Sequence, residues 1–226
     1  MAANSELYLH EQVMLMALND KRGTLQPGAG NSIWAIAAAV LSELLLRERI
    51  SITDDKKQFV EVINAKRVGE PILDECLEKI ATAKRRRRVV DWINSFAWIH
   101  KVSHRIAQRL CDRGILKVEE GTILLIFRRK IFPEIDHRPE QRLIDELKAA
   151  IWSDHGHPVK PQTAALIGLA NATGLLNVYF KSKELKERKS RIAEIIDGSV
   201  ISGATKEAIN AHAALMTMIM TTTVIT

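Results

Sequence analysis

The chain has 226 residues, 46% of them hydrophobic and 27% charged, which is the balance of an ordinary globular protein and excludes disordered and fibrous classes. Its length allows a core that needs no disulfide or metal, and Cys76 and Cys111 fall among apolar neighbours, so free thiols in a reducing compartment are expected. The net charge of +6 indicates an acidic partner: a phospholipid surface, a nucleic acid or an acidic protein.

The two most apolar stretches near the chain ends are not predicted to span a membrane. His10, Glu11 and Gln12 interrupt the stretch 7–18, which also lacks the cleavage site of a secretory signal. The stretch 211–225 is shorter than the roughly 20 residues that cross a bilayer, so it is interpreted as a buried core helix. A cytoplasmic protein is therefore expected.

Apolar residues at helical spacing predict most of the elements in the first half of the chain. The first helix is expected to be capped by Ser5, and a glycine-rich loop over 24–31 precedes a helix that is apolar on nearly all sides. The predicted helices cover 6–18, 32–47, 71–83, 89–97 and 99–113, and short strands are predicted over 49–53 and 59–64.

A β-hairpin is predicted near the middle of the chain. Strand-like residues 115–118 and 122–127 flank Glu119, Glu120 and Gly121, which are expected to form the turn because glycine tolerates the left-handed conformation. Further helices are predicted over 139–151, 162–172, 183–196 and 205–220. With no internal repeat or long linker, residues 1–226 are predicted to form one mainly α domain, a central apolar helix bundle with one protruding hairpin.

The candidates for catalysis or metal binding are weak. His100 and His104 stand four residues apart, as zinc ligands can, but Lys101 occupies the position where a metalloprotease helix carries its glutamate base. The segment 154–157, with Asp154, His155 and His157, is better explained as a solvated loop between helices. Nucleophile elbows, phosphate-binding loops and cysteine pairs are missing from the sequence, so we expect no catalytic residue, metal or cofactor.

Clustered cations are the more informative feature. They form three sets, of which the first is an uninterrupted run: Lys84 to Arg88; Lys101, His104 and Arg105; and Arg128 to Lys130. Close to an anionic leaflet each cation is worth about 1 kcal/mol, although a charge run can also be no more than a solvated face. Trp34, beside the glycine-rich loop, is either an interfacial anchor or a packed residue of an apolar helix.

Several segments, taken in order, resemble the Golgi phosphoprotein 3 family across nearly the whole chain. The segments are LYLHEQVMLMALNDKRG at 7–23, SELLLRERISI at 42–52, PILDECLEKI at 71–80, HRIAQRLCDRGIL at 104–116, QRLIDELKAAI at 141–151 and TAALIGLANATGLL at 163–176. The resemblance implies an all-helical fold, peripheral membrane association, recognition of phosphatidylinositol 4-phosphate in a shallow basic pocket, and no enzymatic activity. It also implies self-association through the hairpin, here through Leu124, Leu125 and Phe127.

The sequence departs from the family at the pocket. Positions that are tryptophan and arginine in the family align here with Gly28, Ala37, His100 and Ser103. The basic extension of eukaryotic members is expected to be missing, as in a bacterial-type member, and the expected ligand is phosphatidylinositol 4-phosphate or another anionic phospholipid bound mainly by charge. The lipid-binding residues are predicted to be Lys21, Arg22, Trp34, His100, Lys101, His104 and Arg105, with a secondary basic patch at Arg85, Arg86, Arg87 and Arg88.

Three functions remain open on the sequence. The first is a peripheral membrane protein that binds anionic lipid headgroups. The second is an oligomeric adaptor that uses the hairpin and the basic face to bind acidic protein segments, such as the cytoplasmic tails of membrane enzymes that eukaryotic relatives bind. Nucleic-acid binding rests on charge alone, because the few aromatic residues lie in apolar surroundings and form no stacking platform.

Overall fold

The structure is a computed structural model that describes residues 6–19, 22–26, 32–123 and 127–201. Its helices are α1 (Leu9–Ala17), α2 (Ser32–Leu46), α3 (Pro71–Ala81), α4 (Val89–Ala97), α5 (Val102–Asp112), α6 (Arg138–Trp152), α7 (Pro161–Ala172), α8 (Leu176–Tyr179), α9 (Ser182–Glu187) and α10 (Lys189–Ile196). Its strands are β1 (Leu18–Asn19), β2 (Thr24–Leu25), β3 (Ile50–Ile52), β4 (Phe59–Val62), β5 (Arg87–Arg88), β6 (Glu119–Ile123) and β7 (Phe127–Ile131). The mainly α fold predicted from the sequence is confirmed.

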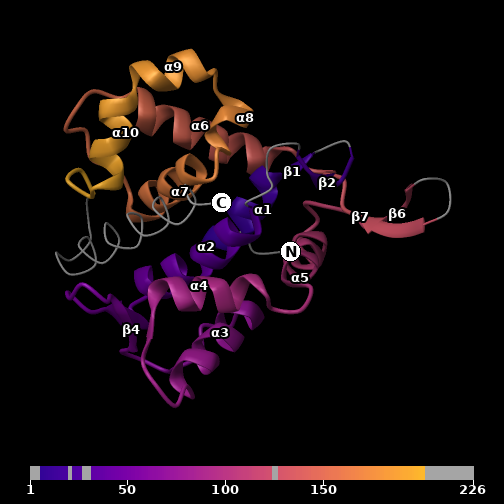
Figure 1. The fold of residues 1–226 in the computed structure, drawn as a ribbon. Coiled ribbons are helices and arrows are strands. Elements are labelled where there is room, and N and C mark those ends of the chain that lie inside the picture. Colours follow the sequence, from indigo (N-terminus) through magenta and orange to yellow (C-terminus); the bar gives the residue numbers. More distant parts are fainter. Residues whose placement is uncertain (1–5, 20–21, 27–31, 124–126, 202–226) are drawn as a thin grey trace.

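Helices α1 and α2 pack against each other at the centre of the molecule (Figure 1). Helix α2 is apolar on nearly all sides and is buried along most of its length, as the pattern predicts. Figure 1 shows α6 to α10 on one side of this pair and α3 and α4 on the other. No helix in the described part of the chain combines the length and the apolar character needed to cross a bilayer.

Every residue of α1 is buried, including polar ones, so the helix depends on partners from distant segments. Glu11 Oε2 accepts hydrogen bonds from the backbone N–H of Tyr8 (3.0 Å) and from Arg113 Nη1 (2.6 Å). Glu43 Oε2, on α2, accepts from the backbone N–H of Leu9 at 2.8 Å. Two buried carboxylates thus satisfy backbone N–H groups that open α1, where a helix has no internal acceptors.

The first helix begins later than the sequence pattern indicates, with Tyr8 as its N-cap. Ser5, the predicted cap, lies outside the described residues. The helix predicted over 183–196 is interrupted at Arg188, which separates α9 from α10. The helix predicted over 205–220 and the apolar stretch 211–225 also lie outside the described residues.

The hairpin is present, but its predicted turn is wrong. Glu119, Glu120 and Gly121 lie within β6, and Gly121 pairs with Arg129 of β7. The chain between the two strands, 124–126, is outside the described residues. The apolar pair at 115–116 has the sequence pattern of a strand. In the structure it is buried in the core, where Leu116 bridges to Glu134, and it does not begin the hairpin.

Two further sheets lie next to basic residues at the surface. Strands β3, β4 and β5 form an antiparallel sheet in that order, in which β5 pairs with β4 through Arg87 and Val60. Strands β1 and β2 form a short pair in which Leu18 faces Leu25, and it turns the chain back just after α1. Figure 1 shows the β6–β7 hairpin extending away from the helices, beside α5.

Gly23 makes the close backbone contact that joins the β1–β2 pair to the end of the hairpin. Its φ is +57°, and a Cβ atom there would lie 2.3–2.5 Å from backbone atoms of Phe132 and Pro133. Its carbonyl accepts a hydrogen bond from the N–H of Phe132 at 2.9 Å. We expect Gly23→Ala to lower the free energy of unfolding by more than about 2 kcal/mol, because a left-handed alanine and an overpacked backbone each cost about 1–3 kcal/mol.

Urea unfolding followed by circular dichroism measures this loss, and Gly114→Ala is the matched control. Gly114 has a φ of +72° but nothing within 4 Å of its Cβ position, so only the left-handed penalty of about 1–2 kcal/mol applies. Equal losses in the two variants would contradict the steric argument.

Candidate functional site

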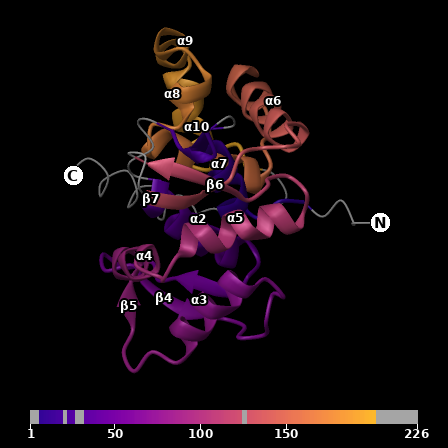
Figure 2. The same ribbon diagram turned by 90° about the vertical axis from the view of Figure 1, so that its right-hand side faces the viewer.

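A hollow of about 260 Å³, which we call the α5 hollow, lies where α1 ends, at the base of the hairpin. Helix α5 and the hairpin both face the viewer in Figure 2. The lining comes from the end of α1, from β2, from the first turn of α5 and from the end of β7; its residues are Met14, Leu18, Gly23, Thr24, Leu25, Ser103, His104, Lys130 and Phe132. None of these residues is acidic, so the lining carries positive charge only.

The β1–β2 turn places a further cation next to the hollow. Asn19 Oδ1 accepts a hydrogen bond from the backbone N–H of Arg22 at 2.9 Å, which holds the turn. Arg22 is exposed and immediately precedes Gly23, which lines the hollow. Lys21, also predicted at this site, lies outside the described residues.

Helix α5 begins in an unusual conformation that exposes its first cations. Its N-cap, Lys101, has a φ of 52°, in the left-handed region that few residues other than glycine adopt. His100, Lys101 and His104 are exposed, whereas Val102 is buried. The chain enters α5 with its basic residues directed to solvent and its apolar stripe on the core.

His104 reports the electrostatics of the hollow. Its ring packs edge-on against Phe132, with ring centroids 4.8 Å apart. Partial burial lowers the pKa of His104, and the charges of Lys130 and Lys101 lower it further. His104 and Lys130 therefore meet at the hollow from two separate elements, with the charge of Lys101 acting on the same ring, and an anion placed beside them would relieve their mutual repulsion.

Arg105, predicted as a lipid-facing cation, is engaged elsewhere. Its Nη1 lies 2.7 Å from Glu75 Oε2 on α3, and the side chain is partly buried. The pairing neutralises the charge and joins α5 to α3. A helical wheel of α5 alone could not reveal this, because the partner is contributed by another helix.

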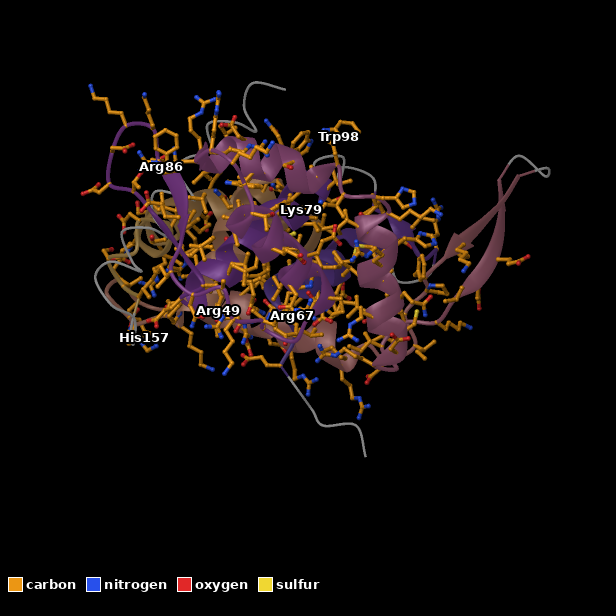
Figure 3. The ribbon with its side chains drawn as sticks, turned by 90° about the horizontal axis from the view of Figure 1, so that it is seen from below. Arg49, Arg67, Lys79, Arg86, Trp98 and His157 are labelled. Atoms are coloured by element: carbon orange, nitrogen blue, oxygen red, sulfur yellow. The ribbon has the colours of Figure 1, made fainter. Side chains whose placement is uncertain are left out.

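Of the two readings of Trp34, packing is the one that fits its environment: the residue is half-buried and contacts the core. The exposed tryptophan is Trp98, with 81% of its surface accessible, in the connection between α4 and α5. Figure 3 shows Trp98 at the edge of the molecule. The exposure of Trp98 could have been predicted from the sequence, because its position lies outside the apolar stripe of α4 to which Trp92 and Phe96 belong.

The other predicted pocket positions are dispersed. Ser103 lines the hollow, and Ala37 is buried inside α2, where it can contact no ligand. Gly28 lies outside the described residues, as do Leu124 and Leu125 of the predicted oligomerisation surface, whereas Phe127 is the first residue of β7. Oligomerisation through the hairpin stays a prediction.

The secondary basic patch lies at the opposite end of α4 from Trp98. Arg86 and Arg88 each pair with an acid, Glu61 at 2.8 Å and Asp91 at 3.1 Å. The patch therefore precedes α4 in the chain, whereas the α5 hollow is lined by the first turn of α5, which follows α4.

Within the described residues, no group of three or more histidine, cysteine, aspartate and glutamate side chains is placed to hold a metal ion. His155, in the loop after α6, has its Nδ1 3.3 Å from Glu194 Oε2. Charged and polar contacts of this kind fit the solvated-loop interpretation.

The sequence profile of Golgi phosphoprotein 3 (GPP34) matches residues 9–212. The chain belongs to this family. Two relatives, both named vacuolar protein sorting-associated protein 74, come from Eremothecium gossypii (31% identical) and Schizosaccharomyces pombe (30% identical), each over 138 residues. Each match covers 53% of this chain and 41% of the relative, so the family member described here spans less than half the length of either relative.

The convergence of cations on the α5 hollow can be measured through His104. We expect Lys130→Gln to raise the pKa of His104, because the substitution removes a positive charge that disfavours protonation. Histidine ring signals followed by NMR against pH give the pKa. Lys148→Gln, on the exposed face of α6, is the charge-matched control and should leave the pKa of His104 unchanged; an unchanged value in both variants would place Lys130 too far from the hollow to matter.

Proposed function

We propose that the protein associates peripherally with membranes by binding anionic phospholipid headgroups at the α5 hollow, without catalysing a reaction. The observation that carries the proposal is that His104 and Lys130 line a hollow with no acid among its described lining residues, while the charge of Lys101 also acts on His104. Membership of the Golgi phosphoprotein 3 family supports a role at membranes, and the names of the two relatives point to protein sorting.

The chemistry of the lining suits a phosphate group. Lys130 supplies charge, and the hydroxyls of Thr24 and Ser103 are donors that can bond phosphate oxygens. Leu25, 45% exposed, adds an apolar surface beside them. The finer proposal is that the headgroup is phosphatidylinositol 4-phosphate or another anionic lipid, bound mainly through charge.

Trp98 is the proposed interfacial anchor in place of Trp34. Tryptophan concentrates at the headgroup level of membranes because its ring is amphipathic. Trp98 is exposed and lies three residues before Lys101, so a membrane that meets the cation also meets the ring. Trp98 would then contribute by burying its ring in the interface, and the cations would contribute by their attraction to anionic headgroups.

The proposal gives binding a pH dependence with a definite sign. The surroundings hold the pKa of His104 below its ordinary value, so the ring is largely neutral at pH 7 in the free protein. A bound anion favours the protonated ring and raises this pKa, so lowering the pH toward 6 should strengthen binding.

Substituting Lys101→Gln together with Lys130→Gln tests the charged part of the site. We expect roughly 30-fold weaker binding to vesicles that contain phosphatidylglycerol, because each cation near an anionic leaflet contributes about 1 kcal/mol and each 1.4 kcal/mol is tenfold. Co-sedimentation at 0.1 M salt measures the affinity. Lys148→Gln with Lys186→Gln, on α6 and α9, is the charge-matched control; equal weakening by the two pairs, or equal binding to neutral vesicles, would refute the site.

Trp98→Ala should weaken vesicle binding by about tenfold, because it removes an aromatic ring worth about 1–3 kcal/mol of burial at the interface. Quenching of fluorescence by brominated lipid locates the ring directly, in variants that retain only Trp98 or only Trp34. We expect quenching of Trp98 and little of Trp34. Vesicle binding that persists with Trp98 unquenched would remove the anchor and leave the charged site standing.

A further inference from the structure

A second hollow, which we call the α4 hollow, lies between the end of α3, β5 and α4, and its volume is about 640 Å³. Five of its lining residues are cations, and a buried tryptophan forms part of its wall; these six residues are Lys79, Lys84, Arg85, Arg86, Arg87 and Trp92. No acidic residue lines it. It shares no lining residue with the α5 hollow.

Two of the arginines are held in place by aromatic rings. The guanidinium of Arg86 lies 5.0 Å from the centre of the Phe59 ring, and that of Arg87 lies 4.6 Å from the centre of the Trp92 ring. Arg87 Nη2 also donates a hydrogen bond to the backbone carbonyl of Asp91 at 2.9 Å. Side chains already ordered in this way lose little entropy when they bind an anion.

The cations of the α4 hollow outnumber the acids that balance them. Arg86 pairs with Glu61 at 2.8 Å, and Lys79 Nζ lies 3.8 Å from Glu75, a carboxylate that also pairs with Arg105. Lys84 and Arg85 are exposed, and neither forms an ion pair with any described residue. Asp55 also interacts electrostatically with Arg86, and Asp91 with Arg87, so the positive charge left to be balanced from solution is mainly that of Lys84 and Arg85.

Trp92 adds an unused hydrogen-bond donor to this wall. The residue is 3% exposed, and its Nε1 has no acceptor among the described residues. A buried donor without a partner costs about 1–3 kcal/mol.

We propose that the α4 hollow is a second anion site, which takes a polyvalent phosphate such as a phosphomonoester or a pyrophosphate group. A phosphodiester carries a single negative charge, whereas a phosphomonoester carries about 1.5 to 2 at pH 7 and better balances the excess. The site stands on its own residues and does not depend on lipid binding at the α5 hollow.

Two sources provide this chemistry, a membrane lipid with a phosphomonoester headgroup and a soluble phosphate compound. Figure 3 shows Arg86 and Trp98 along the same edge of the molecule, so a bilayer that receives Trp98 also lies near the α4 hollow. This arrangement favours the lipid.

Titration of the ¹⁵N-labelled full chain with sodium pyrophosphate tests the site through the indole N–H signals of its four tryptophans. We expect a saturable shift of the Trp92 signal, and a Kd about tenfold higher when Lys84→Gln and Arg85→Gln are combined. Lys66→Gln with Arg67→Gln is the matched control, since it removes the same two kinds of charge from exposed neighbouring positions and should change the Kd less than twofold. Figure 3 shows Arg67 well apart from Arg86.

The absence of a saturable shift, or equal weakening by the two pairs of substitutions, overturns the α4 site. The Lys101→Gln and Lys130→Gln pair should leave the pyrophosphate Kd unchanged, so failure of the α5 hollow and failure of the α4 hollow are distinguishable.

Vesicles separate the two sources once the pyrophosphate titration has succeeded. Phosphatidic acid presents a phosphomonoester, and phosphatidylglycerol at matched charge presents a phosphodiester. Weaker binding of the Lys84→Gln and Arg85→Gln pair on phosphatidic acid alone assigns the site to lipid. Unchanged binding on both assigns the site to a soluble phosphate and overturns the lipid source.

Discussion

Helix α1 is buried along its whole length although it carries polar side chains. The rest of the structure depends on this constraint. Buried polar groups need partners, and two side chains of α1 find theirs on other elements: Arg113, after α5, pairs with Glu11, and Glu70, the cap of α3, lies 3.5 Å from His10. Burial would raise the pKa of Glu70, but the hydrogen bond and charge of His10 bring it below its ordinary value. These pairs fix α3 and α5 around the central helices.

The α5 hollow follows from that arrangement. Helix α1 ends against the core, and the chain must turn back at once through β1 and β2. Gly23 permits the turn to touch the backbone at Phe132, which brings the end of β7 and its Lys130 to the first turn of α5. The close backbone contact at Gly23 thus brings together charged residues from distant parts of the sequence.

Helix α4 divides the basic surface into two regions with different degrees of neutralisation. At its N-terminal end, Arg86 and Arg88 are balanced by acids, while Lys84 and Arg85 form no ion pair within the described part of the chain. At its C-terminal end, the exposed Trp98 leads directly into the cations of α5. The chain therefore carries two candidate sites with different chemistry, one lined by several apolar residues and one rich in guanidinium groups.

The amino-acid sequence by itself determined the fold class, the family and the bounds of elements whose apolar period is local, such as α2 and α4. It could not determine the strands of the hairpin, because the buried pair at 115–116 has the same pattern as a strand. Nor could it reveal that Glu75 neutralises Arg105, or that Lys130 approaches His104. These facts were decided by the tertiary structure alone, since ion pairs and close charges join residues that packing, and not sequence distance, brings together.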